Sequence, residues 1–169
     1  MPFDNNSFDV VWTQHASMNI ADKSRLYSEM YRVLKSNDGG RLVIYDIFKG
    51  PKKYEQEEDN NNTATTTFSY PVPWASNQSM NFLISPDYAK NLLKNTGFRE
   101  IIWEDKTASA LEWFRQMKKR SQSTDESSPS PPIGIHTFVG PQWQTMVENL
   151  VRNYEEGFIF LFVFIVKRL

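Results

Sequence analysis

The residues best suited to chemistry lie at the ends of two short apolar segments. Thr13, Gln14 and His15 come at the end of the first segment, and Asp46 closes the second. His15 could act as a general base or orient an acceptor hydroxyl or amine, because an imidazole titrates near neutral pH. Asp46 could pair with a cationic amine, or it could cap a loop or face solvent. These positions therefore indicate acid–base or ligand-binding chemistry.

Three further residues could contact a bound small molecule. Asn19 could fix a substrate by hydrogen bonds, or it could simply lead into a helix cap at Asp22. Tyr70 and Trp74 belong to an aromatic, proline-rich stretch and could close over an acceptor, since aromatic faces attract ammonium groups; residues of this kind more often only pack. The chain has no cysteine, which excludes disulfides, thiolate metal sites and a cysteine nucleophile. No metal-ligand set is visible.

Two predicted strands and one helix would position these residues. The segments 8–13 and 41–46 are short, β-branched and apolar, which is typical of strands buried on both faces. Between them the spacing predicts a helix over 22–35, with a Gly39-Gly40 break beyond it. Two strands joined by a packed helix are almost always parallel. Ligands bind beyond the carboxyl ends of such strands, so the candidate site comprises 13–19 and the surroundings of Asp46.

The rest of the chain continues the alternation of helices and strands. Helices are predicted after the Ser85-Pro86 start, from Thr107 and over 141–156, and strands over 98–104 and 158–166. The last strand is too short to span a bilayer, which takes roughly 20 apolar residues. The polar segments 49–67 and 121–132 are expected to be disordered insertions within a single domain over 1–169.

Composition limits the classes of partner. The formal net charge is -1, from 19 basic and 20 acidic residues, so nothing in the charge favours nucleic acid or an anionic membrane. The amino terminus has no basic-then-apolar signal pattern. We therefore expect a cytoplasmic protein that binds neither nucleic acid nor membrane.

Four stretches of the sequence together form a known pattern: Met1-Pro2-Phe3, residues 6–12, Arg32-Val33-Leu34 and Gly39-Gly40-Arg41-Leu42. This pattern resembles the second half of a class I S-adenosylmethionine-dependent methyltransferase. Within that family the chain is most similar to the small-molecule type that includes the sarcosine/dimethylglycine and phosphoethanolamine methyltransferases. The resemblance implies an α/β fold: a partial Rossmann-like methyltransferase sheet of parallel strands, with an antiparallel C-terminal strand and helices on both faces.

The resemblance also implies a function. It suggests methyl transfer from S-adenosylmethionine to a small-molecule amine or hydroxyl, with Thr13 and Gln14 beside the amino-acid part of the cofactor and His15 near the acceptor. The family's glycine-rich cofactor loop would belong upstream of Met1, and the chain contains no Gly-x-Gly. We therefore expect an incomplete activity, or alternatively an inactive methyltransferase-like fragment that binds a protein partner. An unpaired outer edge on the first strand would favour a homodimer or poor solubility.

Overall fold

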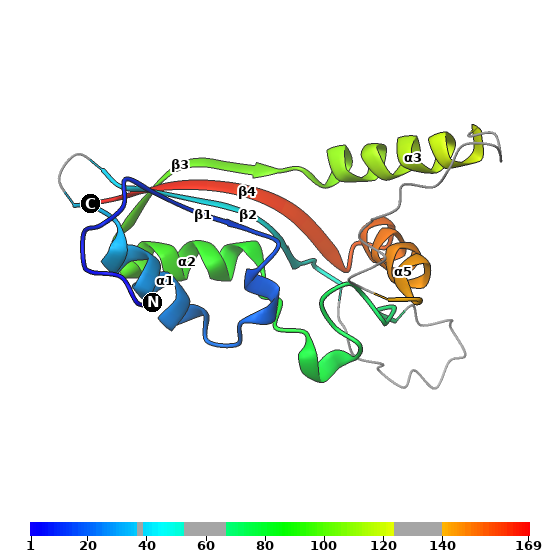
Figure 1. Ribbon diagram of the computed structural model, residues 1–169, viewed down its shortest axis with the longest axis horizontal. Coiled ribbons are helices and arrows are strands. Elements are labelled where there is room, and N and C mark those ends of the chain that lie inside the picture. The colour runs from blue at the N-terminus through cyan, green and yellow to red at the C-terminus, as the bar shows by residue number, and fades with distance from the viewer. Residues whose placement is uncertain (37–38, 53–66, 124–139) are drawn as a thin grey trace.

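A four-stranded mixed sheet forms the centre of the computed structural model, which describes residues 1–36, 39–52, 67–123 and 140–169 (Figure 1). The sheet order is β1-β2-β4-β3. The strands are β1 (Val10–Gln14), β2 (Arg41–Lys49), β3 (Phe98–Asp105) and β4 (Ile159–Arg168). The helices are α1 (Lys23–Val33), α2 (Pro86–Thr96), α3 (Thr107–Ser123) and α5 (Trp143–Glu155), with short 3-10 turns η1 (Ser17–Asn19) and η2 (Gln78–Met80).

The strand pairing confirms the expected topology. β1 and β2 are parallel, and β4 runs antiparallel to both β2 and β3. The parallel pair, the crossover helix α1 and the antiparallel C-terminal strand are thus all as predicted. The two expected insertions, 49–67 and 121–132, fall largely outside the described residues, although β2 includes Lys49 and α3 extends to Ser123.

The predicted caps and stops of α1 and α2 form as expected, but two helices are shorter than predicted. Helix α5 covers Trp143–Glu155, where a helix over 141–156 was predicted. The Asp22 side chain accepts a hydrogen bond from the Arg25 N–H at 2.9 Å, which caps α1. Gly97 ends α2 with a φ of 107°, in the left-handed region that favours glycine. Helix α1 ends at Val33, two residues before the predicted end at 35, because Leu34 turns extended and forms a bridge with Phe8.

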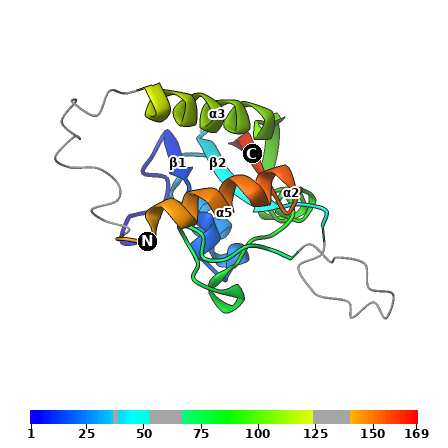
Figure 2. The ribbon, with the colours of Figure 1, turned by 90° about the vertical axis from the view of Figure 1, so that its right-hand side faces the viewer.

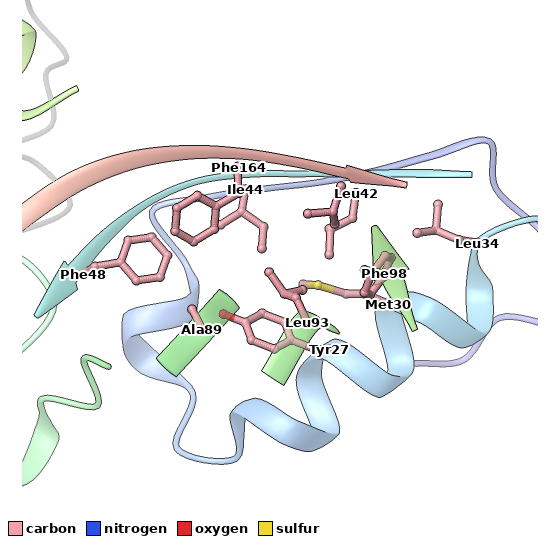
Figure 3. Close-up of a cluster of buried hydrophobic side chains, with 11 residues drawn as sticks. Tyr27, Met30, Leu34, Leu42, Ile44, Phe48, Ala89, Leu93, Phe98 and Phe164 are labelled. Atoms are coloured by element: carbon pink, nitrogen blue, oxygen red, sulfur yellow. The ribbon is translucent and has the colours of Figure 1, made fainter. Parts of the chain in front are cut away.

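The larger apolar core lies between the sheet and the helices α1 and α2, which cover one face (Figures 1 and 3). Tyr27, Phe48 and Phe164 are fully buried in it. Full burial of an apolar side chain of this size contributes about 1.5–3 kcal/mol relative to exposure. The buried members are Tyr27, Met30, Leu34, Leu42, Ile44, Phe48, Ala89, Leu93, Phe98, Phe164 and Val166.

A second core lies where β2 ends and β4 begins, beside α5 and α3 (Figure 2). It also takes in the segment 68–75, which packs there although it is distant in sequence from α5. Figure 1 shows α1 and α2 on one side of the sheet and α3 and α5 beyond the end of the sheet where β2 ends and β4 begins. The buried members are Met18, Ile47, Phe68, Val72, Ala75, Leu150, Tyr154, Phe158, Ile159 and Leu161.

One expectation about β1 is wrong. Its sequence predicted burial on both faces, but Val10 is 54% exposed and Trp12 is 68% exposed. β1 is the edge strand of the sheet, and no described residue covers the face that carries these two side chains. A β-branched, apolar strand therefore has only one buried face here.

Candidate functional site

The carboxylate of Asp46 holds the loop that follows β1. Asp46 is completely buried, and its Oδ2 accepts hydrogen bonds from the backbone N–H groups of Ser17 at 2.8 Å and Ala16 at 3.3 Å. Its Oδ1 accepts from the Ile47 N–H at 2.9 Å. Hydrogen bonds to an ionised acceptor are about twice as strong as neutral ones. The geometry is that of the loop-capping alternative: Asp46 positions residues 16 and 17 and presents no free oxygen to solvent.

A buried lysine lies under the same loop. Lys23 is 4% exposed, and its ammonium group donates to the carbonyl of Phe82 at 2.7 Å and to that of Ile20. Burial lowers the pKa of Lys23 to about 8, and the negative charge of Asp46 offsets part of this shift. The Lys23 side chain therefore joins the start of α1 to the segment that follows η2.

A buried tyrosine completes this polar cluster. The Tyr27 side chain is fully buried, and its hydroxyl has no hydrogen-bond partner among the described residues. Burial and the nearby charge of Asp46 both raise the pKa of Tyr27, so the phenol stays neutral. In this cluster the negative charge of the Asp46 carboxylate is therefore balanced by the positive charge of the Lys23 ammonium group.

His15 is exposed and directly precedes Ala16 and Ser17, the two residues whose amides bind Asp46. Its φ of 47° is in the left-handed region, which is uncommon for a residue other than glycine and is often found at functional sites. The backbone N–H of His15 donates to the backbone carbonyl of Tyr45 at 3.0 Å. The imidazole ring lies edge-on to the Tyr45 ring, with centroids 5.3 Å apart. Partial desolvation lowers the pKa of His15, so the imidazole is neutral near pH 7 and is able to accept a proton.

The other predicted site residues near the end of β1 differ in their exposure to solvent. Thr13 is buried and pairs in register with Ile44, which belongs to the core under α1 and α2. Gln14 points to the other face and is exposed. Asn19 is exposed at the end of η1, three residues before Asp22, the cap of α1. Of the two residues predicted to contact the cofactor, Gln14 alone presents its side chain to solvent.

Tyr70 and Trp74 are joined by a third residue, Asn81. The indole N–H of Trp74 donates to the Asn81 Oδ1 at 3.1 Å, and the Asn81 Nδ2 donates to the Tyr70 hydroxyl at 2.9 Å. Both aromatic rings pack against the second core, and so does Tyr45, the ring partner of His15. The structure thus brings the aromatic pair to the same end of the sheet as His15.

Two asparagines of α5 fix the backbone that carries Tyr70. The buried Asn153 accepts from the Ser69 N–H at 2.8 Å and donates to the Ser69 carbonyl at 3.0 Å. Asn149, one turn earlier, donates to the Pro71 carbonyl at 3.0 Å. Sequence reasoning missed these two residues and also Lys23 and Asn81. The i, i+4 spacing of two asparagines beside an apolar helix stripe was the one available signal.

These groups form one wall of a candidate ligand site. The wall consists of the loop after β1, the end of β2 and the 70–82 segment, with an exposed imidazole and an aromatic pair. The described residues include no glycine-rich loop of the kind that the resemblance leads us to expect for S-adenosylmethionine. No group of three or more His, Cys, Asp or Glu residues in the described ranges is arranged to hold a metal ion. Over the same residues, no helix is long and apolar enough to cross a bilayer.

The chain is similar in sequence to known methyltransferases. A family model described as "Methyltransferase domain" matches residues 1–44. Glycine/sarcosine/dimethylglycine N-methyltransferase from Actinopolyspora halophila is 24% identical over 157 residues, which are 93% of this chain and 24% of that protein. The chain therefore spans about a quarter of the length of this relative.

Solved structures share the fold. A protein described as a sarcosine dimethylglycine methyltransferase from Galdieria sulphuraria has a TM-score of 0.66 and 19% identity, over 99% of this chain and 56% of that one. A geranyl diphosphate methyltransferase solved in complex with SAM has a TM-score of 0.62 and 15% identity, over 100% of this chain and 54% of that one. The chain is thus similar in sequence to S-adenosylmethionine-dependent methyltransferases of small molecules and shares their fold.

Proposed function

We propose that this chain forms the acceptor side of an S-adenosylmethionine-dependent methyltransferase that acts on a small molecule. The observation that carries the proposal is the loop after β1. The buried Asp46 carboxylate fixes the Ala16 and Ser17 amides, and this leaves His15 exposed beside Tyr45 at the carboxyl end of the parallel pair. That end is where open parallel sheets bind their ligands.

His15 is the proposed general base. S-adenosylmethionine, when bound, supplies an electrophilic methyl group on its sulfonium sulfur. An amine acceptor that is protonated at neutral pH, such as dimethylglycine, must lose one proton before its lone pair can bond that methyl group, whereas a hydroxyl loses its proton as the bond forms. The carbon–sulfur bond breaks in the same step, and S-adenosylhomocysteine is the leaving group. The neutral His15 imidazole accepts this proton, and its lowered pKa keeps it unprotonated near pH 7. Aligning the acceptor is the larger part of catalysis, because the protein forms no covalent bond.

The small-molecule acceptor is supported by the relatives and by the wall itself. The Actinopolyspora protein is named for glycine, sarcosine and dimethylglycine, which are small amino acids. Tyr70 and Trp74 are half-buried aromatic residues at the same end of the sheet, suited to an ammonium group. In this proposal Gln14 and Asn19 are the exposed polar contacts, and Thr13 and Asp46 act from beneath the surface.

Calorimetric titration of S-adenosylhomocysteine into the chain tests the cofactor, and transfer of labelled methyl from S-adenosylmethionine to dimethylglycine tests the reaction. We expect binding at micromolar strength, and His15→Gln should keep this binding while lowering the transfer rate by about 10²- to 10⁴-fold. Near-ultraviolet circular dichroism serves as the folding control. A folded chain that gives no heat would contradict the proposal.

A second candidate function is favoured by the edge of β1. Here the chain is a methyltransferase-like fragment without activity that binds a protein partner. The exposed Val10 and Trp12 side chains lie along an edge strand that pairs on one side with β2, and such an edge is a ready template for another strand. A homodimer formed through this edge is one form of that proposal. Loss of cofactor binding together with stable self-association would favour it.

A further inference from the structure

The sheet face opposite to α1 and α2 carries a row of apolar side chains. One register position contributes one residue from each strand: Trp12, Val43, Ile165 and Ile102. Side chains paired across strands share one face of a sheet, and Leu42 and Ile44, on either side of Val43, belong to the core under α1 and α2. Trp12 is 68% exposed, and none of the four belongs to either apolar core. This apolar row therefore crosses the sheet on the face that α1 and α2 leave open.

A row of three cations lies beside the apolar row, toward the start of β2. Arg41 pairs in register with Lys167, and Lys167 pairs with Arg99, so the three side chains share the face of the apolar row. Arg41 and Arg99 are exposed, and none of the three forms a salt bridge with a described residue. Like charges directly opposite each other destabilise a sheet. An anionic partner would relieve the repulsion within this cationic row.

The acidic side chains next to these strand positions are already paired. Glu100, which follows Arg99, points to the opposite face and forms a salt bridge with Lys90 of α2 at 2.6 Å. Asp9, at the start of the edge strand, forms one with Lys35 at 2.9 Å. Each of these carboxylates has a cation of its own, so neither neutralises the cationic row.

The Lys167 side chain is held over a glycine. Gly39 has a φ of 85°, and a Cβ added to it would clash with the Cε of Lys167. The stem of Lys167 therefore packs against bare backbone. A side chain that is already ordered loses less rotamer freedom when an anion binds it.

An amphipathic helix is the element that fits an apolar row with cations along one side. Helices α1 and α2 already cover the other face of this sheet with their apolar stripes, and layered α/β packing buries a second sheet face in the same way. We propose that the apolar and cationic rows dock an amphipathic α-helix of a partner protein, whose apolar stripe is flanked by Asp or Glu. The inference goes beyond methyl transfer, because the cationic row lies at the opposite end of the parallel strands from His15.

An anionic membrane would offer the same charges, but the chain supports it less well. The formal net charge is -1, so the protein as a whole is not attracted to an anionic surface. Val43, Ile102 and Ile165 are half-buried within the sheet face. A helix can pack against such recessed side chains, whereas insertion into a bilayer needs apolar side chains that project.

Two synthetic peptides of about 18 residues, long enough to form a helix, serve as probes. Both carry the same leucine stripe at helical spacing, and the stripe is flanked by glutamate in one peptide and by lysine in the other. Fluorescence anisotropy of the labelled peptides measures their binding to the full chain. We expect the glutamate peptide to bind about tenfold more tightly or better. This preference should shrink between about 0.05 and 0.5 M salt, because salt screens exposed charges.

Two variants test the rows separately, with near-ultraviolet circular dichroism as the folding control. Replacing all three residues of the cationic row by Gln should lower the affinity for the glutamate peptide about 30-fold, at about threefold for each exposed ion pair. The matched control replaces Arg25, Lys94 and Arg152 by Gln, which removes the same charge from exposed positions on α1, α2 and α5. Trp12→Ala should weaken the binding of both peptides about tenfold, because a large aromatic side chain contributes strongly to an interface.

Several results would overturn the inference. Equal binding of the two peptides, or an equal loss in the control variant, would show that the cationic row does not recognise an acidic stripe. Wild-type affinity in Trp12→Ala would exclude the apolar row. Binding to phosphatidylglycerol vesicles without binding of the glutamate peptide would assign the face to a membrane. Self-association that the cationic-row variant abolishes, again without peptide binding, would assign it to a second copy. Titration of S-adenosylhomocysteine, measured in parallel, tests the proposed function independently of this face.

Discussion

Replacing Asp46 by asparagine should destabilise the chain by about 3 kcal/mol. The two side chains have the same shape, but asparagine has one acceptor oxygen where the carboxylate uses two. In the wild type, one oxygen binds the Ser17 and Ala16 amides and the other binds the Ile47 amide. In Asp46→Asn one of these sets faces an NH₂ group, and each lost bond to a charged group costs about 1.5–3 kcal/mol. Lys23 also loses the charge that offsets its burial.

Urea unfolding at pH 7, followed by tryptophan fluorescence, measures this loss. A loss of about 3 kcal/mol is a large part of the 5–15 kcal/mol by which domains are typically stable. Hydrogen exchange at the Ala16 and Ser17 amides should accelerate in the variant, because the loop loses its anchor. The control is Asp9→Asn: Asp9 forms an exposed ion pair with Lys35 at 2.9 Å, and its loss should cost at most about 1 kcal/mol.

The reasoning would be refuted by a particular pattern. If Asp46→Asn changed the free energy of unfolding by no more than Asp9→Asn, the buried carboxylate would not be what holds the loop. Unchanged exchange at both amides would lead to the same conclusion. A double variant with Lys23→Met adds a further check, since two opposite charges that attract each other should give a total loss smaller than the sum of the two single losses.

Two other predictions concern Lys23 and Trp12. The pKa of Lys23 falls from 10.5 to about 8 on folding, so the unfolded chain binds more protons between these values and stability should rise as the pH increases from 8 to 10.5. The rise should be at most about 3 kcal/mol, and the urea midpoints of wild type and Lys23→Met, compared across this pH range, should show it in the wild type alone. Trp12→Lys should reduce self-association in light scattering and change the free energy of unfolding by no more than about 0.5 kcal/mol, because Trp12 is 68% exposed. A wild-type chain that is monomeric at high concentration would contradict the proposed homodimer.

Local signals in the sequence accounted for most of the fold. The Asp22 and Ser85 caps, the Gly97 stop and the apolar helix stripes each depend on residues within one or two turns, and the structure contains all of them. The antiparallel direction of the last strand came from the resemblance, since neither composition nor periodicity specifies how a strand runs relative to its neighbours. The place of β4 between β2 and β3 was not predicted and comes from the structure.

The contacts that build the candidate site could not be read in this way. Asn153 and Ser69 are 84 positions apart, and Lys23 and Phe82 are 59 apart, so no local pattern marks either pair. Lys23 lies at the first position of α1, where a lysine would ordinarily be assigned to solvent. The exposed face of β1 was missed for a related reason: Val10 and Trp12 have the residue types of a buried strand, and their exposure depends on which helices lie over them.

The two halves of the proposed acceptor wall are coupled through Lys23. The loop that carries His15 is held by Asp46, whose charge favours the ammonium form of Lys23. That ammonium group donates to the carbonyl of Phe82, the residue next to Asn81, and the Phe82 N–H donates to the Met18 carbonyl at 3.2 Å. A change in the charge of Lys23 should therefore affect both the loop of His15 and the segment that carries Asn81. Lys23→Met should consequently lower both the rate of methyl transfer and the affinity for the acceptor, whereas His15→Gln should lower the rate alone.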